Sequence, residues 1–396
     1  MKRRLLPILM TLVLVCALPI WAAFVTSGDV TNPLLTTAAA SEMALQERIN
    51  QANAGATITL NSNTEIAATL QITKNLTLDL NGYVLKMGGT GHITSSAEVE
   101  IKDGESNRAH TGEYAALPAG GVITGGKAES GGGILLDGGC TLKLTGGCIT
   151  DCRATDTGGG GVDLRGSTAI LYISGTARIE NCTAGEMWGA NAIFNSGTMY
   201  ADGGTVDGTV NNQGTIKRSE GTADMDMTVF NKAVYNRAGK SIEAGIYKGT
   251  VENRGSITGG TFYGGVTDDG GTIRGGTFAV TFDRGDGTKT EPTLVEWNGK
   301  VSRPTSDPEK SGHTFVGWYL GDALYDFNTP VNAPLTLTAR WEEVPSSGGN
   351  YYYHPTTDTK ADDAKGSPKT ADPGVALYAA LSLLSLTGLT CTAKKR

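Results

Sequence analysis

Histidine, proline and charged residues are scarce in this chain, and each scarcity narrows what the protein can be. Of its 396 residues only 4 are His and 18% are charged, which disfavours a histidine or carboxylate active site. Only 13 residues are Pro, and the chain has no Gly-X-Y repeat with glycine at every third position, so it is not collagen-like. The formal net charge is −7, and removing the +3 of residues 1–28 and the +2 of residues 371–396 leaves −12 on the remainder. Because an acidic surface repels polyanions, we expect no nucleic acid as a partner.

Glycine, in contrast, is abundant. The chain has 56 Gly, about twice the average usage, which implies many turns at short and regular intervals. Val, Ile, Leu and Thr alternate with polar residues between these glycines. This pattern predicts an all-β protein, and the length suits one long domain followed by a small one.

Internal repeats account for the glycine. Residues 131–136 recur as residues 159–164, and residues 149–152 recur as residues 179–182. The spacing is about 28 to 30 residues, which is typical of a repeat protein in which each unit is one turn of the chain. Strands of three to five residues are expected between corners formed by Gly, Asn or Asp.

The repeat becomes shorter farther along the chain. Val234, Val251 and Val266 stand at equivalent positions, and the period has fallen to about 15 to 17 residues. One such unit cannot bury its own apolar face, whereas stacked units align like residues in ladders about 4.8 Å apart. The sequence therefore predicts a solenoid.

An amphipathic helix is expected just before the first repeat. Leu45, Ile49 and Ala52 fall on one helical face, which would cover the open end of the first turn of the solenoid. The segment 76–85 then resembles the opening coils of right-handed parallel β-helix proteins of the pectin-lyase type. The resemblance extends over residues 42–278 and implies that fold, which enzymes, phage tailspikes and adhesins all use.

Residues 279–341 have a different pattern. Residues 312–319, Gly-His-Thr-Phe-Val-Gly-Trp-Tyr, and the closing strand 335–341 resemble the Listeria-Bacteroides repeat, also called the internalin-type B repeat. The resemblance implies a small β-grasp-like module of a surface protein. Phe315, Trp318 and Trp341 are expected in its core rather than on a ligand platform.

The C-terminal part reads as a stalk and an anchor. Residues 342–366 are polar and predict a flexible linker. Residues 375–391 carry no charge, are about long enough to span a membrane and precede a basic end. A retained membrane anchor is one interpretation.

A sortase sorting signal is the other interpretation of the tail. Residues 367–396 resemble the Gram-positive signal, in which an LPxTG-type pentapeptide precedes an apolar span and a basic stub. Pro368 and Thr370 match the pentapeptide, whereas Ser367 replaces Leu and Ala371 replaces Gly. The resemblance implies cleavage after Thr370, an acyl-enzyme with the sortase cysteine and transfer to a peptidoglycan amine.

The N-terminus agrees with export. Lys2, Arg3 and Arg4 precede an uncharged stretch, as in a secretory signal peptide, which we assign to residues 1–28. We therefore expect an extracellular protein that is anchored in the cell wall of a Gram-positive bacterium and contacts the membrane before sorting.

Four cysteines lie in the exported part, namely Cys140, Cys148, Cys152 and Cys182, and their spacing matches no zinc motif. Cys152 and Cys182 occupy equivalent repeat positions, which places them within reach of a disulfide. Buried thiols are the first interpretation, a Cys152–Cys182 disulfide the second and a metal site the third. We expect neither a metal nor a cofactor.

Two classes of function follow. The first is a monomeric, non-enzymatic adhesin that binds glycans or proteins of a host or a neighbouring cell through its β-helix face. The second is a surface-tethered polysaccharide lyase or glycoside hydrolase, which would need a cluster of carboxylates. Asp268 and Asp269 form the only acidic doublet of the solenoid, at an expected turn. His92 and His110 have no carboxylates beside them and are expected to be surface or packing residues.

Overall fold

The computed structural model describes residues 45–185, 190–223 and 226–345. The chain divides into two units, Met1–Val344 and Pro345–Arg396, and the described residues before Pro345 all belong to the first. The expected signal peptide, most of the linker, the span 375–391 and the sorting residues Pro368, Thr370 and Ala371 lie outside the described residues. Within the described ranges, no helix has the length and apolar character needed to cross a membrane.

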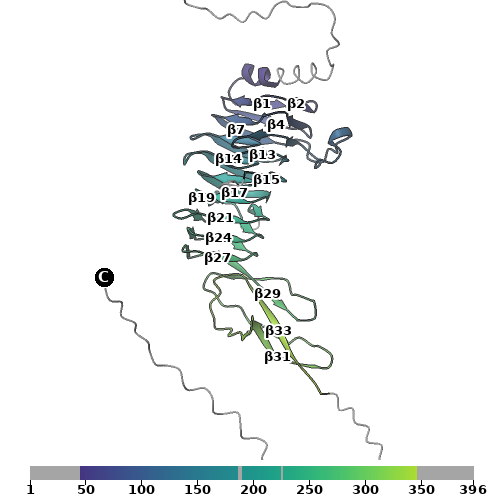
Figure 1. Cartoon of the computed structure of the whole chain (residues 1–396), viewed down its shortest axis with the longest axis vertical. Coiled ribbons are helices and arrows are strands. Elements are labelled where there is room, and N and C mark those ends of the chain that lie inside the picture. The colour runs from purple at the N-terminus through teal and green to yellow at the C-terminus, as the bar shows by residue number, and fades with distance from the viewer. Residues whose placement is uncertain (1–44, 186–189, 224–225, 346–396) are drawn as a thin grey trace, which may run out of the picture. The chain divides into compact units, whose positions relative to one another are not determined.

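The described chain is almost entirely β-structure, as the sequence predicts. Residues 45–51 are helical, and a short 3₁₀ turn, η1, spans Gly112–Tyr114. Most of the strands belong to three parallel ladders, and Figure 1 labels strands from each of them. The ladders are named here by the order in which the chain visits them.

The first ladder consists, in spatial order, of β1 (Ala56–Thr59), β4 (Leu76–Asp79), β7 (Glu98–Lys102), β11 (Thr141–Leu144), β15 (Ile170–Glu180), β17 (Thr198–Asp207), β19 (Thr215–Lys217), β22 (Ser241–Ile242), β25 (Ser256–Ile257) and β28 (Thr272–Ile273). The second consists of β2 (Thr64–Ile66), β5 (Val84–Met87), β8 (Val122–Thr124), β12 (Cys148–Thr150), the far halves of β15 and β17, β20 (Val229–Phe230), β23 (Ile246–Tyr247), β26 (Thr261–Phe262) and β29 (Thr277–Asp283). The third consists of β3 (Leu70–Ile72), β6 (Ile93–Ser95), β10 (Ile134–Leu136), β14 (Val162–Leu164), β16 (Ile193–Asn195), β18 (Val210–Asn212), β21 (Val234–Asn236), β24 (Val251–Asn253) and β27 (Val266–Asp268).

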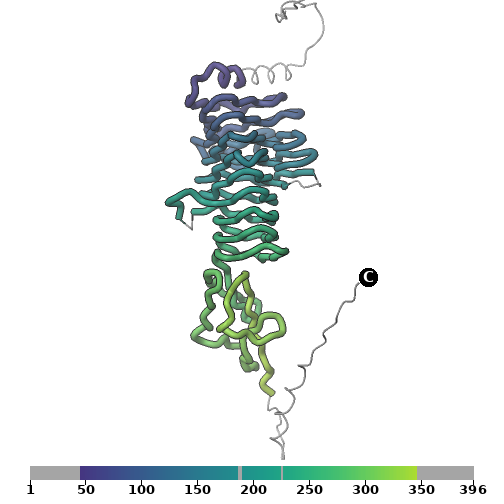
Figure 2. The backbone as a smooth tube through the Cα atoms, turned by 90° about the vertical axis from the view of Figure 1, so that its left-hand side faces the viewer, coloured from purple at the N-terminus to yellow at the C-terminus, as the bar shows by residue number. Residues whose placement is uncertain are grey.

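Successive turns of the chain visit the ladders in the same order, and the last turn ends at β29 without a third-ladder strand. The turns stack on one another (Figure 2). A small pair, β9 (Lys127–Ala128) with β13 (Arg153–Ala154), lies outside the ladders. The pairings confirm the predicted repeats. Ile134 pairs with Val162 and Ile149 pairs with Ile179, as the 28- to 30-residue period requires. The shorter period is confirmed as well, because Val234, Val251 and Val266 are consecutive partners in the third ladder.

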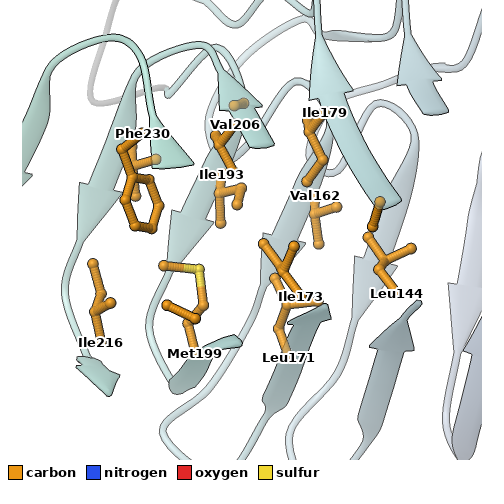
Figure 3. Close-up of a cluster of buried hydrophobic side chains, with 14 of the residues drawn as sticks. Leu144, Val162, Leu171, Ile173, Ile179, Ile193, Met199, Val206, Ile216 and Phe230 are labelled. Atoms are coloured by element: carbon orange, nitrogen blue, oxygen red, sulfur yellow. The ribbon is translucent and has the colours of Figure 1, made fainter. Parts of the chain in front are cut away.

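The core lies between the ladders and is made of rows of like side chains. Leu171, Met199 and Ile216 are successive partners in the first ladder and face the interior (Figure 3). The opposing rows of the second and third ladders include Val206 and Ile193, which are also fully buried. Burial of apolar side chains from all three ladders at once removes the faces that a single turn would leave in water.

Aromatic rings replace the aliphatic row toward the end of the second ladder. Phe230, Tyr247, Phe262 and Phe278 stack with centroid distances of 4.9, 4.9 and 5.3 Å. Gly276 stands where φ is +99°, and a Cβ atom there would lie 2.9 Å from the Phe262 ring. Gly245, Gly260 and Gly276 each stand two residues before a ring of the stack, and the missing side chain lets the neighbouring ring pack closely.

Four successive strands of the third ladder, β16, β18, β21 and β24, end in an asparagine whose side chain is buried. The side-chain amides of these asparagines form a ladder of hydrogen bonds. The Nδ2 atoms of Asn195, Asn212 and Asn236 each donate to the Oδ1 atom of the next asparagine at 2.8 Å, and Asn253 donates to Asp268 Oδ1 at 2.9 Å. Each Nδ2 also donates to a backbone carbonyl of the following turn. The amides are buried at almost no cost because these hydrogen bonds replace those with water.

The N-terminal helix covers the open end of the ladders, which confirms that prediction. Leu45 and Ile49 are 2% and 1% exposed. The Gln46 amide accepts from the Gln71 N–H at 2.9 Å and donates to the Gln71 carbonyl at 3.0 Å, so it satisfies the free edge of β3. Arg48 donates to the carbonyl of Thr59 in β1 at 2.7 Å. The helix thus blocks the edges to which another strand could add.

The last strand of the second ladder also begins the C-terminal module. β29 pairs with β30 (Thr293–Glu296) and β33 (Leu335–Glu343), β33 pairs with β31 (His313–Leu320), and β31 pairs with β32 (Ala323–Leu324). Trp318 is 3% exposed and contacts Phe282 edge to face, which confirms it as a core residue. Phe315 and Trp341 are half-buried, lie 5.5 Å apart and pack against the same core.

Replacing Asn236 with Ala should destabilise the protein by about 2–4 kcal/mol. The change removes the acceptor of Asn212 and the donor to Asn253 inside the protein, and each buried group left unpaired costs about 1–3 kcal/mol. The measurement is urea unfolding followed by circular dichroism. Thr267→Ala, at an exposed position of the same ladder, is the matched control and should change stability by less than about 0.5 kcal/mol. Equal effects of the two changes would contradict the role assigned to the amide ladder.

Candidate functional site

A groove of about 410 Å³ lies where the chain turns from the first ladder to the second. It extends across several turns of the chain, from Arg218 after β19 to Glu296 and Trp297 at the end of β30. Its lining therefore combines the repeated corners of the ladders with one hairpin of the C-terminal module. A second hollow of about 500 Å³ lies under the N-terminal helix, where Gln46 already caps β3.

Backbone atoms form the floor of the groove. Gly259 and Gly275 occupy the same corner in successive turns, and a Cβ atom at either would lie 2.1 Å from a carbonyl oxygen of the turn before. Side chains are therefore excluded at these corners. A bound molecule can reach the peptide groups of the floor directly, as in other sites where glycine permits close approach.

Polar groups surround this floor. Glu243 accepts a hydrogen bond from the hydroxyl of Ser241 at 3.0 Å, which orients its carboxylate. The guanidinium of Arg218 donates to the Thr222 carbonyl at 3.2 Å. Glu296 is exposed and adds a second carboxylate from the module. Acceptors and a donor of this kind match the hydroxyl groups of a polar ligand.

One aromatic side chain borders the groove. Trp297 is 36% exposed, and its backbone N–H donates to the carbonyl of Gly276 at 2.8 Å. This hydrogen bond attaches the hairpin to the glycine corner and so places an indole ring beside the floor. The groove thus has an apolar surface and a set of hydrogen-bonding groups at once, a combination found in sites for small organic ligands.

Asp268 and Asp269, the acidic doublet considered as a catalytic pair, each bind a different neighbouring side chain. Asp268 accepts from Asn253 at the end of the amide ladder. Asp269 forms an ion pair with Arg254 at 2.7 Å. The two carboxylates therefore serve the last turn of the third ladder.

The two histidines considered from the sequence are also separate from each other. His110 Nε2 lies 2.8 Å from the Gly120 carbonyl, in the loop that contains η1. His92 Nδ1 lies 3.4 Å from the Thr69 hydroxyl. Each contacts its own local backbone or side chains, and neither lines the groove.

Cys152 and Cys182 lie in neighbouring turns, as the repeat predicts, since the next residues, Arg153 and Thr183, form a parallel bridge. Both are buried free thiols in the structure. A hydrogen bond with Cys182, together with burial, raises the pKa of Cys152 well above its ordinary value. A disulfide between them stays a prediction. Among residues 45–185, 190–223 and 226–345, no group of three or more His, Cys, Asp or Glu could hold a metal ion.

One titratable side chain was not found from the sequence. Asp163 is only 3% exposed, and burial raises the pKa of its carboxyl to about 6, against the opposing effects of Arg165 and a Ser130 hydrogen bond. Its side chain lies against Gly158, where a Cβ atom would be 2.4 Å from Asp163 Oδ2. Asp163 pairs with Leu135 of the turn before and Phe194 of the turn after, which are half-buried, so the repeat pattern alone does not indicate this burial. Asp163 does not line the groove.

The raised pKa of Asp163 predicts a pH-dependent stability. The folded protein binds the proton more tightly than the unfolded chain, so this contribution is fully present below about pH 4 and is lost as the pH rises through about 6. The difference amounts to about 2–3 kcal/mol. Unfolding free energies of the unmodified protein and of Asp163→Asn, measured from pH 4 to 8, should diverge by this amount. A constant difference across that range would contradict the assignment.

Comparison with known proteins identifies one part of the chain. Residues 278–340 match the model of the Listeria-Bacteroides repeat domain. Two proteins of Evansella cellulosilytica, named "Putative Gly-rich membrane protein" and "Putative membrane protein", are 36% and 34% identical over 67 residues, or 16% of this chain. The matched stretch spans only 8% and 10% of those two proteins. No solved structure matches this chain.

Proposed function

We propose that this chain is a non-enzymatic surface protein that binds a glycan in the groove beside Trp297. The observation that carries the proposal is the combination of a backbone floor, an exposed indole and polar walls in one open groove. Sugars offer both hydroxyl groups and apolar C–H faces. The indole would stack on such a face, while Glu243, Glu296 and Arg218 would bond the hydroxyls.

The fold supports a role in display. The three parallel ladders, visited in constant order, are the arrangement expected of a right-handed parallel β-helix of the pectin-lyase type, and we assign residues 42–278 to it. We assign residues 279–341 to a β-grasp-like repeat module that follows it. In this proposal the module is a ligand-binding partner as well as a spacer, because it contributes Glu296 and Trp297 to the groove.

The repeat match and the two membrane-protein relatives support a bacterial surface protein. We propose that the signal peptide exports the chain as a monomer and that sortase attaches it to peptidoglycan at Thr370. The glycan would then belong to a host or a neighbouring cell. A retained membrane span at residues 375–391 is the alternative anchor.

An enzymatic role remains a second hypothesis. Asp163 has the raised pKa that a general acid needs, and this observation favours a surface-tethered polysaccharide lyase or glycoside hydrolase. Such an enzyme also needs a second carboxylate near the scissile bond, and the groove carboxylates come from other turns of the chain. We therefore prefer binding to turnover.

Trp297→Ala should weaken glycan binding by about tenfold, equivalent to about 1.4 kcal/mol, because the stacking surface is lost. The measurement is binding of the whole chain, kept in solution with a mild detergent, to a panel of neutral and uronate-containing polysaccharides. New reducing ends and unsaturated products are followed in the same samples.

Leu294→Ala is the matched control, since Leu294 is an exposed apolar residue of the same hairpin and does not line the groove. It should bind glycan as the unmodified chain does. Glycan binding that survives Trp297→Ala would rule out the groove as the site. Turnover of any polysaccharide would overturn the non-enzymatic proposal and direct attention to Asp163.

Thr370→Ala should abolish covalent attachment to the cell wall, because the resemblance to the sorting signal implies that sortase recognises the threonine at this position before it attacks its carbonyl. In a Gram-positive host, the unmodified protein should be released only by digestion of peptidoglycan, whereas the variant should be extracted by detergent. Thr357→Ala, in the stretch assigned to the linker, is the control and should leave attachment unchanged. Detergent extraction of the unmodified protein would favour the retained membrane anchor.

A further inference from the structure

The turn that follows β29 carries the sequence Arg284-Gly285-Asp286, and all three residues are exposed. It connects β29 to the antiparallel bridge formed by Asp283 and Lys289. We propose that this turn is a second adhesion site, which binds a protein receptor through the Arg284 guanidinium and the Asp286 carboxylate. The receptor class is one that pairs an arginine with acidic groups and takes a carboxylate as a ligand of its own divalent cation.

The turn is ordered by its own hydrogen bonds. Asp283 Oδ1 accepts from the Gly285 N–H at 2.9 Å. Asp286 Oδ1 accepts from the N–H and the hydroxyl of Thr288 at 2.8 and 2.6 Å. The Arg284 N–H donates to the Thr288 carbonyl at 3.0 Å, which closes the turn.

The module core holds the turn from the other side. The indole N–H of Trp341 donates to the Arg284 carbonyl at 2.9 Å, and Trp341 packs against Phe315. Asp283 also forms an ion pair with Lys289 at 3.4 Å. Arg284 and Asp286 are thus displayed from a backbone that loses little further entropy on binding, and such pre-organisation favours affinity.

The two side chains have the chemistry that the receptor needs. Hydrogen bonds from Thr288 engage Oδ1 of Asp286 and lower the pKa of its carboxyl, so the group is ionised at neutral pH. A carboxylate has two oxygens, so Oδ2 of Asp286 could bind a hard cation such as Mg²⁺, which prefers oxygen ligands. The planar guanidinium of Arg284 can pair with a carboxylate through two parallel hydrogen bonds.

The cation has to come from the receptor. Asp283 and Asp286 are the two carboxylates of the turn, and among the described residues no group of three or more His, Cys, Asp or Glu could hold a metal ion. A receptor that keeps one coordination position of its metal open would therefore complete its ligand shell with Asp286. Receptors of the integrin class, which recognise Arg-Gly-Asp, have this arrangement and provide the probe.

The test measures binding of the whole chain to an immobilised integrin ectodomain of the Arg-Gly-Asp-binding class in the presence of Mg²⁺. We expect binding that a short linear Arg-Gly-Asp peptide competes away and that EDTA abolishes. Asp286→Glu lengthens the side chain by one methylene and should weaken binding at least about tenfold. Arg284→Lys keeps the charge but removes the planar fork, so it should also weaken binding, and it leaves every hydrogen bond of Asp286 in place.

Two controls separate this site from the fold and from the groove. Thr288→Val removes one hydrogen bond to Asp286 but retains both recognition groups, so it should weaken binding less than Asp286→Glu does. Trp297→Ala, which impairs the glycan groove, should leave receptor binding unchanged. Absence of Mg²⁺-dependent binding, or binding that persists in Asp286→Glu or in EDTA, would overturn the proposal whatever the outcome for glycans.

Discussion

The stacking of parallel strands in register is the constraint on which the rest of this structure depends. A spacing of about 4.8 Å between strands brings each side chain into contact with its equivalent in the next turn. Similar side chains are therefore favoured at equivalent positions of successive turns. The protein has three kinds of such rows. Aliphatic rows fill the middle of the core, stacked rings from Phe230 to Phe278 fill one corner, and an amide ladder lines another. The glycine-lined groove is a fourth consequence, because glycines at the same corner of successive turns leave backbone atoms as its floor.

Much of the fold could be predicted from the sequence because its information is local and repeated. Spacing alone predicts three features that the structure has: the equivalence of Ile134 with Val162, the shorter period after Val234 and the helix that buries Leu45. Spacing is informative here because stacking in register fixes which residues of successive turns lie next to each other. The core role of Trp318 followed from its resemblance to a known repeat and from its strand pattern.

The candidate site could not be predicted in the same way, because it depends on contacts between parts with different periods. Trp297 reaches the groove because β30 pairs with β29 and the Trp297 N–H donates to the Gly276 carbonyl, and no sequence rule relates a hairpin of one module to a corner of another. Asp163 occupies a position where a repeat would expose its side chain, yet the chain near Gly158 covers it.

The protein also joins its two parts, the ladders and the C-terminal module, without a linker. β29 is at once the last strand of the second ladder and the first strand of the module, so removal of the module would leave a bare sheet edge.

The amide ladder has a direction, and its final member sets a limit. Every asparagine donates toward the C-terminal end, and Asn212, Asn236 and Asn253 also accept from the amide before them, so the row behaves as a one-way chain of donors. Asp268 accepts the last of these bonds, but a carboxyl group has no N–H with which to continue the series. A further turn, or the first turn of a second molecule stacked on this end, would meet an acceptor where the pattern requires a donor. One oxygen in place of one amide nitrogen thus ends the amide ladder at β27.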